Sequence, residues 1–215
     1  MTNKLVTKII TIDGPASVGK STLAKKISNH FKAPLLHSGR LYRAVALEMI
    51  ENKIKLSDRI GILQSVKMVI KKNLKKRELY SSEIDKISSI ISTKKYLRDE
   101  LKNYQRQFPL KMAKGKRFAV IEGRDIGTEI FPKADYKIFM WANAKIRAQR
   151  RYDQISANGQ KISFRRIYNE ITDRDMKDIN RKVAPLRPAV NSVLLDTSYL
   201  DIEQAFNVVN KIIEN

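Results

Sequence analysis

The segment 14–21 restricts the possible folds of this chain more than any other. It reads GPASVGKS and fits the pattern G-x-x-x-x-G-K-[ST] at every constrained position, between an apolar, β-branched segment (8–13) and a helix-like one (21–31). In that context glycines let the backbone wrap a phosphate, and backbone N–H groups supply positive partial charge. The pattern predicts that Lys20 reaches the phosphates of a nucleoside triphosphate and that Ser21 ligates Mg²⁺. The alternative is a glycine-rich turn with a chance lysine.

Strands and helices alternate along most of the chain. Apolar segments predict strands at 8–13, 33–37, 118–122, 136–140 and 193–195. Helices are predicted at 21–31, 41–51, 58–66, 94–114, 144–156, 163–181 and 202–213. This alternation predicts an α/β fold of three layers, with a central parallel five-stranded sheet covered on both faces. Ligands bind such sheets beyond the carboxyl ends of the strands.

The weakest pattern lies in the segment 56–92. After the helix at 58–66 come two short candidate strands, 68–70 and 78–80, which a charged turn could join as a hairpin. We therefore expect this segment to be an insertion outside the main sheet.

The composition excludes several kinds of site. The chain has no cysteine and only two histidines, His30 and His37. Disulfides, cysteine-ligated metals, thiol nucleophiles and multi-histidine metal sites are thereby excluded. No apolar run approaches the roughly 18 residues of a membrane helix, and no signal-like segment precedes Gly14. We expect a cytoplasmic protein with no membrane contact.

The net charge of +21, from 43 Lys+Arg against 22 Asp+Glu, suggests a polynucleotide partner. The lysines, however, are scattered along the whole chain, in pairs such as Lys25–Lys26 and Lys94–Lys95. No stripe of aromatic residues alternates with basic ones. These observations favour a lysine-rich surface, and we expect no specific nucleic-acid partner.

Two other classes of P-loop protein lack their markers here. A GTPase carries an N-K-x-D segment, and the nearest candidate, NAKI at 143–146, does not fit. A motor ATPase has a long apolar strand that ends in a magnesium-binding Asp, whereas the strand at 118–121 is followed by EGRD. A small kinase remains.

Two motifs follow predicted strand ends on what would be the acceptor side. The S-G-x-x-Y-R segment at 38–43 places a hydroxyl and a glycine at a helix start, with Arg43 about one turn in, and suits a second anion. Helix capping is the alternative. Arg124 and Asp125 lie in a glycine-flanked loop and offer a donor fork beside an acceptor, or else an ion pair that stabilises the loop.

Arg174, Asp178 and Arg181 are spaced by four and three residues, which places them on one face of a predicted helix. Two arginines and a carboxylate there would close on a transferring phosphoryl group and neutralise its developing charge. Taken alone, a row of surface ion pairs is the simpler interpretation.

Together these motifs resemble those of bacterial cytidylate kinases. The resemblance runs from Lys8 to the C-terminal helix, and it is carried by GPASVGKS, S-G-x-x-Y-R, EGRDIGT (122–128), the D-R-D…D-x-N-R helix (173–181) and VAPL (183–186). It implies a P-loop kinase fold with a core (1–55 and 93–215), an NMP-binding insertion (about 56–92) and a short lid (about 150–164). It also implies ATP-dependent phosphorylation of CMP and dCMP with Mg²⁺. Nothing demands a partner chain, so we expect a monomer.

The resemblance also implies residue roles. The catalytic residues would be Lys20, Arg174, Asp178 and Arg181. ATP would be bound by Gly14, Pro15, Ala16, Ser17, Val18, Gly19, Lys20, Ser21, Thr22 and Arg150, with Ser21 also ligating Mg²⁺. CMP would be bound by Ser38, Gly39, Arg43, Arg124, Arg174 and Arg181 around its phosphate and by Ser89, Arg98 and Asp125 at its base. A carboxylate at Asp125 suits the cytosine N4 amine, whereas uracil presents an acceptor there.

One position departs from the family's pattern, because the residue before Ser38 is usually acidic and here is His37. An acid could orient magnesium-bound water or Lys20, and a neutral imidazole would not do so in the same way. We also expect Lys20 to face solvent in the absence of a ligand. The competing interpretations are a P-loop kinase acting on another nucleotide or on shikimate, and a P-loop protein that binds nucleic acid.

Overall fold

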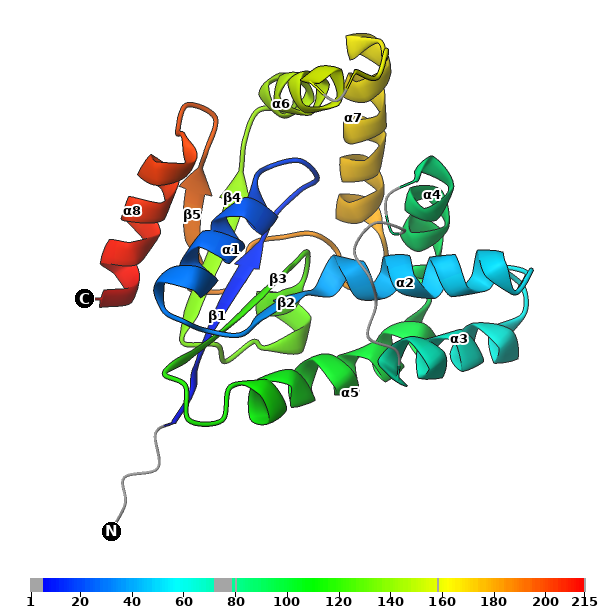
Figure 1. Ribbon diagram of the computed structural model, residues 1–215, viewed down its shortest axis with the longest axis horizontal. Coiled ribbons are helices and arrows are strands. Elements are labelled where there is room, and N and C mark those ends of the chain that lie inside the picture. The colour runs from blue at the N-terminus through cyan, green and yellow to red at the C-terminus, as the bar shows by residue number, and fades with distance from the viewer. Residues whose placement is uncertain (1–5, 72–78, 80, 158, 215) are drawn as a thin grey trace.

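Five parallel strands, in the order β2-β3-β1-β4-β5, form the centre of the protein (Figure 1). The computed structural model describes residues 6–71, 79, 81–157 and 159–214. Its strands are β1 (Lys8–Asp13), β2 (Leu35–His37), β3 (Phe118–Gly123), β4 (Tyr136–Trp141) and β5 (Val193–Asp196). Its helices are α1 (Lys20–His30), α2 (Ser38–Glu51), α3 (Arg59–Lys71), α4 (Ser82–Ile91), α5 (Lys95–Met112), the π-helical turn η2 (Ile126–Ile130), α6 (Ala144–Ala157), α7 (Phe164–Asn180) and α8 (Ile202–Glu214).

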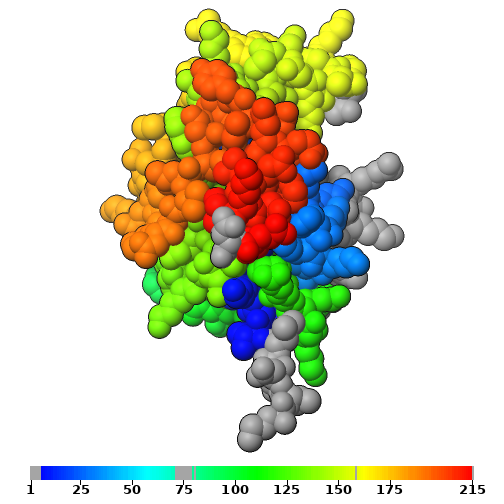
Figure 2. All heavy atoms as spheres, turned by 90° about the vertical axis from the view of Figure 1, so that its left-hand side faces the viewer, coloured from blue at the N-terminus to red at the C-terminus, as the bar shows by residue number. Residues whose placement is uncertain are grey.

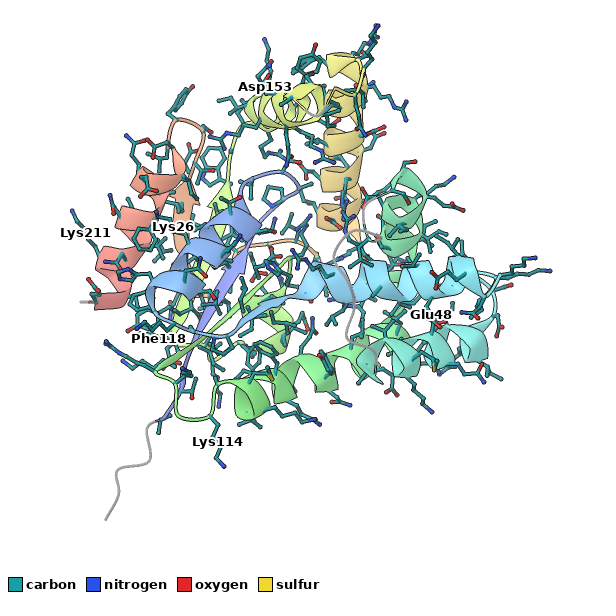
Figure 3. All side chains as sticks on the ribbon, in the orientation of Figure 1. Lys26, Glu48, Lys114, Phe118, Asp153 and Lys211 are labelled. Atoms are coloured by element: carbon teal, nitrogen blue, oxygen red, sulfur yellow. The ribbon has the colours of Figure 1, made fainter. Side chains whose placement is uncertain are left out.

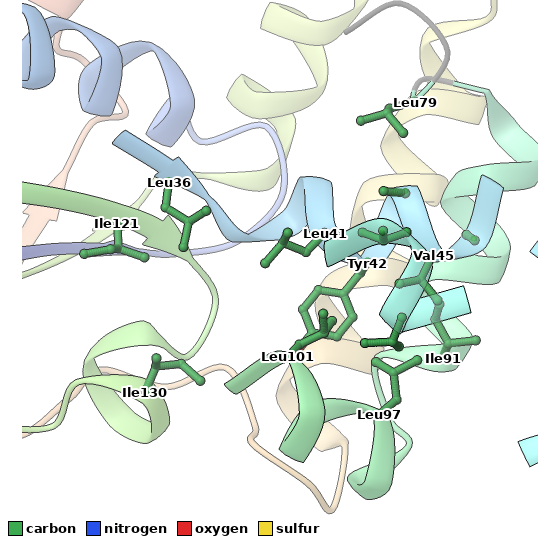
Figure 4. Close-up of a cluster of buried hydrophobic side chains, with 14 of the residues drawn as sticks. Leu36, Leu41, Tyr42, Val45, Leu79, Ile91, Leu97, Leu101, Ile121 and Ile130 are labelled. Atoms are coloured by element: carbon green, nitrogen blue, oxygen red, sulfur yellow. The ribbon is translucent and has the colours of Figure 1, made fainter. Parts of the chain in front are cut away.

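Apolar side chains bury both faces of the sheet. On one face Ile10, Ile12 and Phe118 pack in a cluster with residues of α1 and α8. On the other face Ala119 and Ile121 pack in a second cluster with residues of α2 and α5, part of which Figure 4 shows. Strands buried on both faces read as continuous apolar runs, which is why their positions were predictable. The predicted three-layer α/β fold is confirmed.

The register of the sheet brings three strand ends together. Asp13, the last residue of β1, lies opposite Gly123 of β3, and His37 of β2 lies opposite Glu122. A β-carbon on Gly123 would collide with the Ser38 hydroxyl, so this glycine permits the close approach of β3 to the start of α2. The loops that follow β1, β2 and β3 therefore share one edge of the sheet.

The hairpin expected in the segment 56–92 is wrong. Residues 68–70 belong to α3, in which Ile62, Val66 and Val69 are buried at helical spacing. In the second predicted strand, Glu78 and Tyr80 lie outside the described residues, and Leu79 is buried against the α2 side of the core.

Helix α4 was not predicted from the sequence. Ser81 caps this helix, since its side chain accepts a hydrogen bond from the backbone N–H of Ile84 at 3.2 Å. Glu83 and Asp85 in the first turn suit the positive end of the helix dipole. The start signal was present in the sequence, but a serine-rich interior obscured the apolar face.

Helices α6 and α7 pack on one another through a separate small cluster around Ala148, Ile167 and Ile171. In the side view of Figure 2 they form the top of the molecule, above the face that α8 covers. Lysines on distant elements point outward, as Lys114 and Lys211 do in Figure 3. Within the described ranges, no helix is long and apolar enough to cross a membrane.

Candidate active site

A cavity of about 820 Å³ opens at the carboxyl ends of the strands. Of the predicted site residues it is lined by Ala16, Ser17, Val18, Gly19, Lys20, Ser21, Thr22, Ser38, Gly39, Arg43, Ser89, Arg98, Arg124, Asp125, Arg150, Arg174, Asp178 and Arg181. Gly14 and Pro15 do not line it. The cavity therefore gathers the motifs from four distant parts of the chain, while the role of each residue stays a prediction.

The P-loop needs its glycines for steric reasons. A β-carbon on Gly14 would collide with the backbone oxygen of Met140 on β4. Gly19 has a φ of 96° and ends the loop immediately before α1. Such left-handed backbone favours glycine and lets successive N–H groups turn toward a phosphate.

Lys20 is buried, which contradicts the expectation that it faces solvent. Only 5% of the residue is exposed, and its Nζ donates a hydrogen bond to the backbone oxygen of Pro15 at 2.6 Å. Burial, followed by the nearby charge of Arg124, lowers the pKa of Lys20 well below its usual value. The side chain thus folds back onto its own loop, near the charged groups of Glu122, Arg124 and Arg174.

Glu122, at the end of β3, is a site residue that the sequence analysis missed. Its Oε1 accepts hydrogen bonds from Ser21 Oγ at 3.2 Å and from His37 Nδ1 at 3.0 Å. Burial would raise the pKa of Glu122, but the bond from His37 and the charges of Lys20 and Arg124 outweigh it, and the net shift is downward. Glu122 could have been predicted as a site residue because it lies near the end of a strand that pairs with the strand before the P-loop.

Asp13, directly before the P-loop, fastens the loop that carries Arg124 and Asp125. Its two carboxylate oxygens accept hydrogen bonds from the backbone N–H groups of Ile126 at 2.9 Å and of Gly127 at 2.7 Å. Burial raises the pKa of Asp13 to about 7, against the lowering effect of these two bonds. A buried carboxylate thus joins the end of β1 to the loop that follows β3.

Replacing Asp13 with Asn is expected to change how stability depends on pH. The raised pKa means that the contribution of Asp13 is largest below its unfolded pKa of 3.8 and is lost as the pH rises through about 7. From pH 4 to 7 the free energy of unfolding of the wild type should therefore fall relative to that of the variant, by at most about 1.4 kcal/mol per unit of pKa shift. Urea unfolding at several pH values measures this difference, and a pH-independent difference would contradict it.

A buried charge cluster surrounds Asp125 in the same cavity. Arg98 Nη2 of α5 donates to Asp125 Oδ2, and Arg181 Nη2 lies 3.8 Å from Asp125 Oδ1. The guanidinium of Arg98 also lies 5.6 Å from the centre of the Tyr42 ring. Burial raises the pKa of Tyr42 to about 12, so its hydroxyl stays protonated. The cluster presents a carboxylate between two arginines beside an aromatic ring.

Further arginines line the same cavity. Arg124 Nε donates to Asp178 Oδ2 at 3.1 Å. Burial and the charge of Arg124 lower the pKa of Arg174 to about 10. Among the described residues, neither Arg174 Nε nor Arg181 Nη2, both buried, has a hydrogen-bond partner. Unpartnered donor atoms on cationic side chains suit the binding of an anion.

Residues of two helices complete the walls of the cavity. Asp85, on the unpredicted helix α4, forms ion pairs with two arginines: its Oδ1 lies 2.5 Å from Arg43 Nη2 and 3.8 Å from Arg174 Nη1. Arg150 of α6 donates through Nη2 to the backbone oxygen of Thr197, just beyond β5, at 2.5 Å. The remaining lining residues that sequence reasoning missed are Arg40, Tyr42, Ser88, Ser92, Gly123, Arg151, Gln154, Ile155 and Gln160.

The chain is similar to known proteins over almost its whole length. A family profile for cytidylate kinase matches residues 10–215. The cytidylate kinases of Methylocella silvestris and Bradyrhizobium diazoefficiens are 37% and 38% identical to it, over 96% of this chain and 94% and 95% of theirs.

Solved structures with low sequence identity share the fold. A protein from Eubacterium ventriosum has a TM-score of 0.59 at 14% identity, covering 97% of this chain and 99% of that one. Shikimate kinase from Bacteroides thetaiotaomicron has a TM-score of 0.50 at 10% identity, covering 98% of this chain and 100% of that one. These likenesses support the P-loop kinase fold and nothing narrower.

Proposed function

This chain belongs to the cytidylate kinase family, and on that premise we propose that it transfers the γ-phosphoryl group of ATP to CMP or dCMP. The bond from the γ-phosphorus to the oxygen of ADP breaks as a bond to an oxygen of the acceptor phosphate forms, and the products are ADP and CDP or dCDP. The observation that carries the proposal is that one cavity contains both the P-loop with Lys20 and the buried Arg98–Asp125 pair.

On the donor side, the P-loop would hold the ATP phosphates. Its backbone N–H groups and the N-terminus of α1 favour negative charge, and Lys20 would exchange its bond to Pro15 for the phosphates. Arg150 would lie against the nucleoside end, because its guanidinium already contacts the carbonyl groups after β5.

Ser21 and Glu122 would hold a Mg²⁺ ion together with the phosphates. Their oxygens lie 3.2 Å apart, and Mg²⁺ commonly binds one or two protein oxygens, phosphates and waters. Among the described residues no group of three or more acidic or histidine side chains could hold a metal without substrate. The bound ion would neutralise charge on the β- and γ-phosphates.

On the acceptor side, Asp125 would accept the cytosine amine, with Arg98 and Ser89 at the same base. Ser38, Gly39 and Arg43 would lie at the acceptor phosphate with Arg124. We assign the helices within 56–92 to the acceptor-binding insertion and residues 150–164 to the lid. In support, α4 contributes Asp85, Ser88 and Ser89 to the cavity, and α6 contributes Arg150 and Gln154.

Arg174 and Arg181 would neutralise the transferring phosphoryl group, with Asp178 holding Arg124 in place. Replacing Arg174 or Arg181 with Ala is expected to lower kcat about tenfold, because the remaining arginines partly compensate, and to change ATP binding less. Steady-state kinetics and calorimetric ATP titration measure the two effects. Arg166→Ala, at an exposed position of the same helix, is the control. A rise in the apparent KM for ATP alone would contradict this role.

The substrate assignment is tested by measuring phosphoryl transfer from ATP to CMP, dCMP, UMP, AMP, GMP and shikimate. We expect CMP and dCMP to have the highest kcat/KM. A different preferred acceptor would replace the proposed function with that of another P-loop kinase. The net charge of +21 makes nucleic-acid binding the alternative function to test. Sequence-specific retention of RNA or DNA on filters at physiological salt would establish that alternative.

His37→Asp is expected to lower severalfold the Mg²⁺ concentration that gives half-maximal rate. The change replaces the hydrogen bond at Glu122 Oε1 with a second carboxylate, and two adjacent carboxylates favour a cation between them. For the same reason the variant should be less stable than the wild type when Mg²⁺ is absent. His37→Asn, which keeps a donor without adding charge, is the control. An unchanged magnesium titration would show that this position does not act on the metal.

We also propose that the enzyme works as a cytoplasmic monomer. The cavity draws its donor-side and acceptor-side residues from a single copy of the chain, so the proposed reaction requires no partner. Sedimentation of the active enzyme is expected to give the mass of one chain, and a dimer at assay concentrations would contradict this.

A further inference from the structure

Two buried charged residues outside the predicted site connect the P-loop with α6 and α7. Arg147 of α6 is 5% exposed and Asp175 of α7 is 8% exposed. The Nη2 of Arg147 lies 2.6 Å from Asp175 Oδ2. In Figure 1 the two helices stand beyond the carboxyl ends of β1 and β4, next to the P-loop.

This ion pair contacts both backbone polar groups of one P-loop residue. Arg147 Nη1 donates to the backbone oxygen of Ala16 at 2.9 Å, and the backbone N–H of Ala16 donates to Asp175 Oδ1 at 3.4 Å. The third contact of the guanidinium, from Nε to the backbone oxygen of Ala142 at 2.8 Å, fixes it to the end of β4. The pair thus joins the P-loop, a central strand and both helices.

The burial of the pair indicates a role in geometry. Removing two charges from water costs free energy that their attraction offsets only when the remaining polar atoms are also satisfied. Here all three guanidinium nitrogens have an acceptor, and both oxygens of Asp175 have a partner. Fixing both polar groups of Ala16 restricts the orientation of the loop backbone that leads to Lys20.

We propose that Arg147 and Asp175 are positioning residues that hold the P-loop in its phosphate-binding shape and fix it to α6 and α7. The same helices carry Arg150 and Arg174 into the cavity, so the pair also sets where these arginines lie relative to the loop. The inference rests on the proposed function, because it takes the ligand of the P-loop to be ATP.

The test measures binding of a non-hydrolysable ATP analogue with Mg²⁺, and separately of CMP, by titration calorimetry. The variants are Arg147→Met, Asp175→Asn and the two combined. Arg166→Met and Glu170→Gln are the matched controls, because they break an exposed ion pair of 2.9 Å within α7. Thermal unfolding with and without the ATP analogue accompanies each titration.

Each single variant is expected to raise the Kd of the ATP analogue about tenfold, since the loop loses its fixed geometry, and to raise the Kd of CMP much less, because the pair contacts the P-loop directly and affects CMP through the position of Arg174. The combined variant should lose no more than the worse single variant, because the two residues act as a unit. The rise in Tm that the analogue produces should shrink in these variants and stay unchanged in the controls. Arg147→Lys, which keeps the charge but not all three contacts, is expected to be intermediate.

Three results would overturn the inference. The first is an unchanged Kd for the ATP analogue, and the second is an equal loss of ATP-analogue and CMP binding. The third is a lower Tm of the variants together with the same rise in Tm on adding the ATP analogue as in the wild type, which would assign the pair to stability alone. If Arg147→Met does not fold, Arg147→Lys decides by the same criteria. If the proposed function itself is wrong, the wild-type protein will not transfer the phosphoryl group of ATP to CMP, which distinguishes that failure from failure of this inference.

Discussion

Lys20→Ala is expected to lower kcat for CMP phosphorylation by about 10²–10³-fold, the loss typical of removing one preorganised group that stabilises developing charge. Lys20 is buried against Pro15, and its pKa is lowered because burial disfavours its charged form. Removing a desolvated cation relieves that cost, so the variant should fold. In the proposed complex the ammonium group would exchange its bond to Pro15 for bonds to the phosphates. Loss of Lys20 should therefore affect the reaction far more than stability.

The matched control is Lys25→Ala, on the exposed side of the same helix. Steady-state kinetics and thermal unfolding of both variants separate the two effects. Near-normal turnover in Lys20→Ala would exclude this residue from catalysis. A lost transition in its unfolding curve would instead make Lys20 part of the structure of the loop.

The fold was predictable where one local pattern determines the structure. The apolar run at β1 and the glycines at 14 and 19 combine strand, turn and helix start in a single motif, and the structure keeps that order. The segment 56–92 was predicted less well, because the β-branched residues near Val69 suit a strand as well as a helix. This segment is helical because Ile62, Val66 and Val69 of α3 are buried against neighbouring helices. No local sequence pattern contains that information.

The site was predictable as a set of motifs but not as a set of contacts. The motifs meet because parallel strands bring their carboxyl ends to one edge, a rule that applies to β1, β2 and β3 here. The importance of Glu122 depends on the strand register that sets it beside His37 and near Ser21. The Arg147–Asp175 pair depends on how α6 and α7 pack against the P-loop, which is tertiary information. The bond from Lys20 back to Pro15 is likewise a contact that the motif itself does not contain.

Asp125→Asn is expected to lower the ratio of kcat/KM for CMP to that for UMP by roughly ten- to a hundredfold, the effect of one well-placed polar contact. The aspartate accepts from the cytosine amine in the proposed complex and repels the uracil carbonyl. Asparagine keeps the shape and replaces one acceptor with a donor, which can pair with uracil O4. A site with a buried polar group rejects the ligand that leaves this group unpaired.

The structure adds a second expected effect of the same change. Asp125 is the partner of Arg98 and lies 3.8 Å from Arg181, so a neutral side chain leaves two buried cations without their shared counter-charge. Activity toward both nucleotides should therefore fall, and the CMP-to-UMP ratio should fall in addition. Asp99→Asn, an exposed aspartate on α5 paired with Lys95, is the control and should leave both quantities unchanged. An equal loss for CMP and UMP would assign Asp125 to holding the two arginines, and an unchanged ratio with full activity would remove it from the acceptor site.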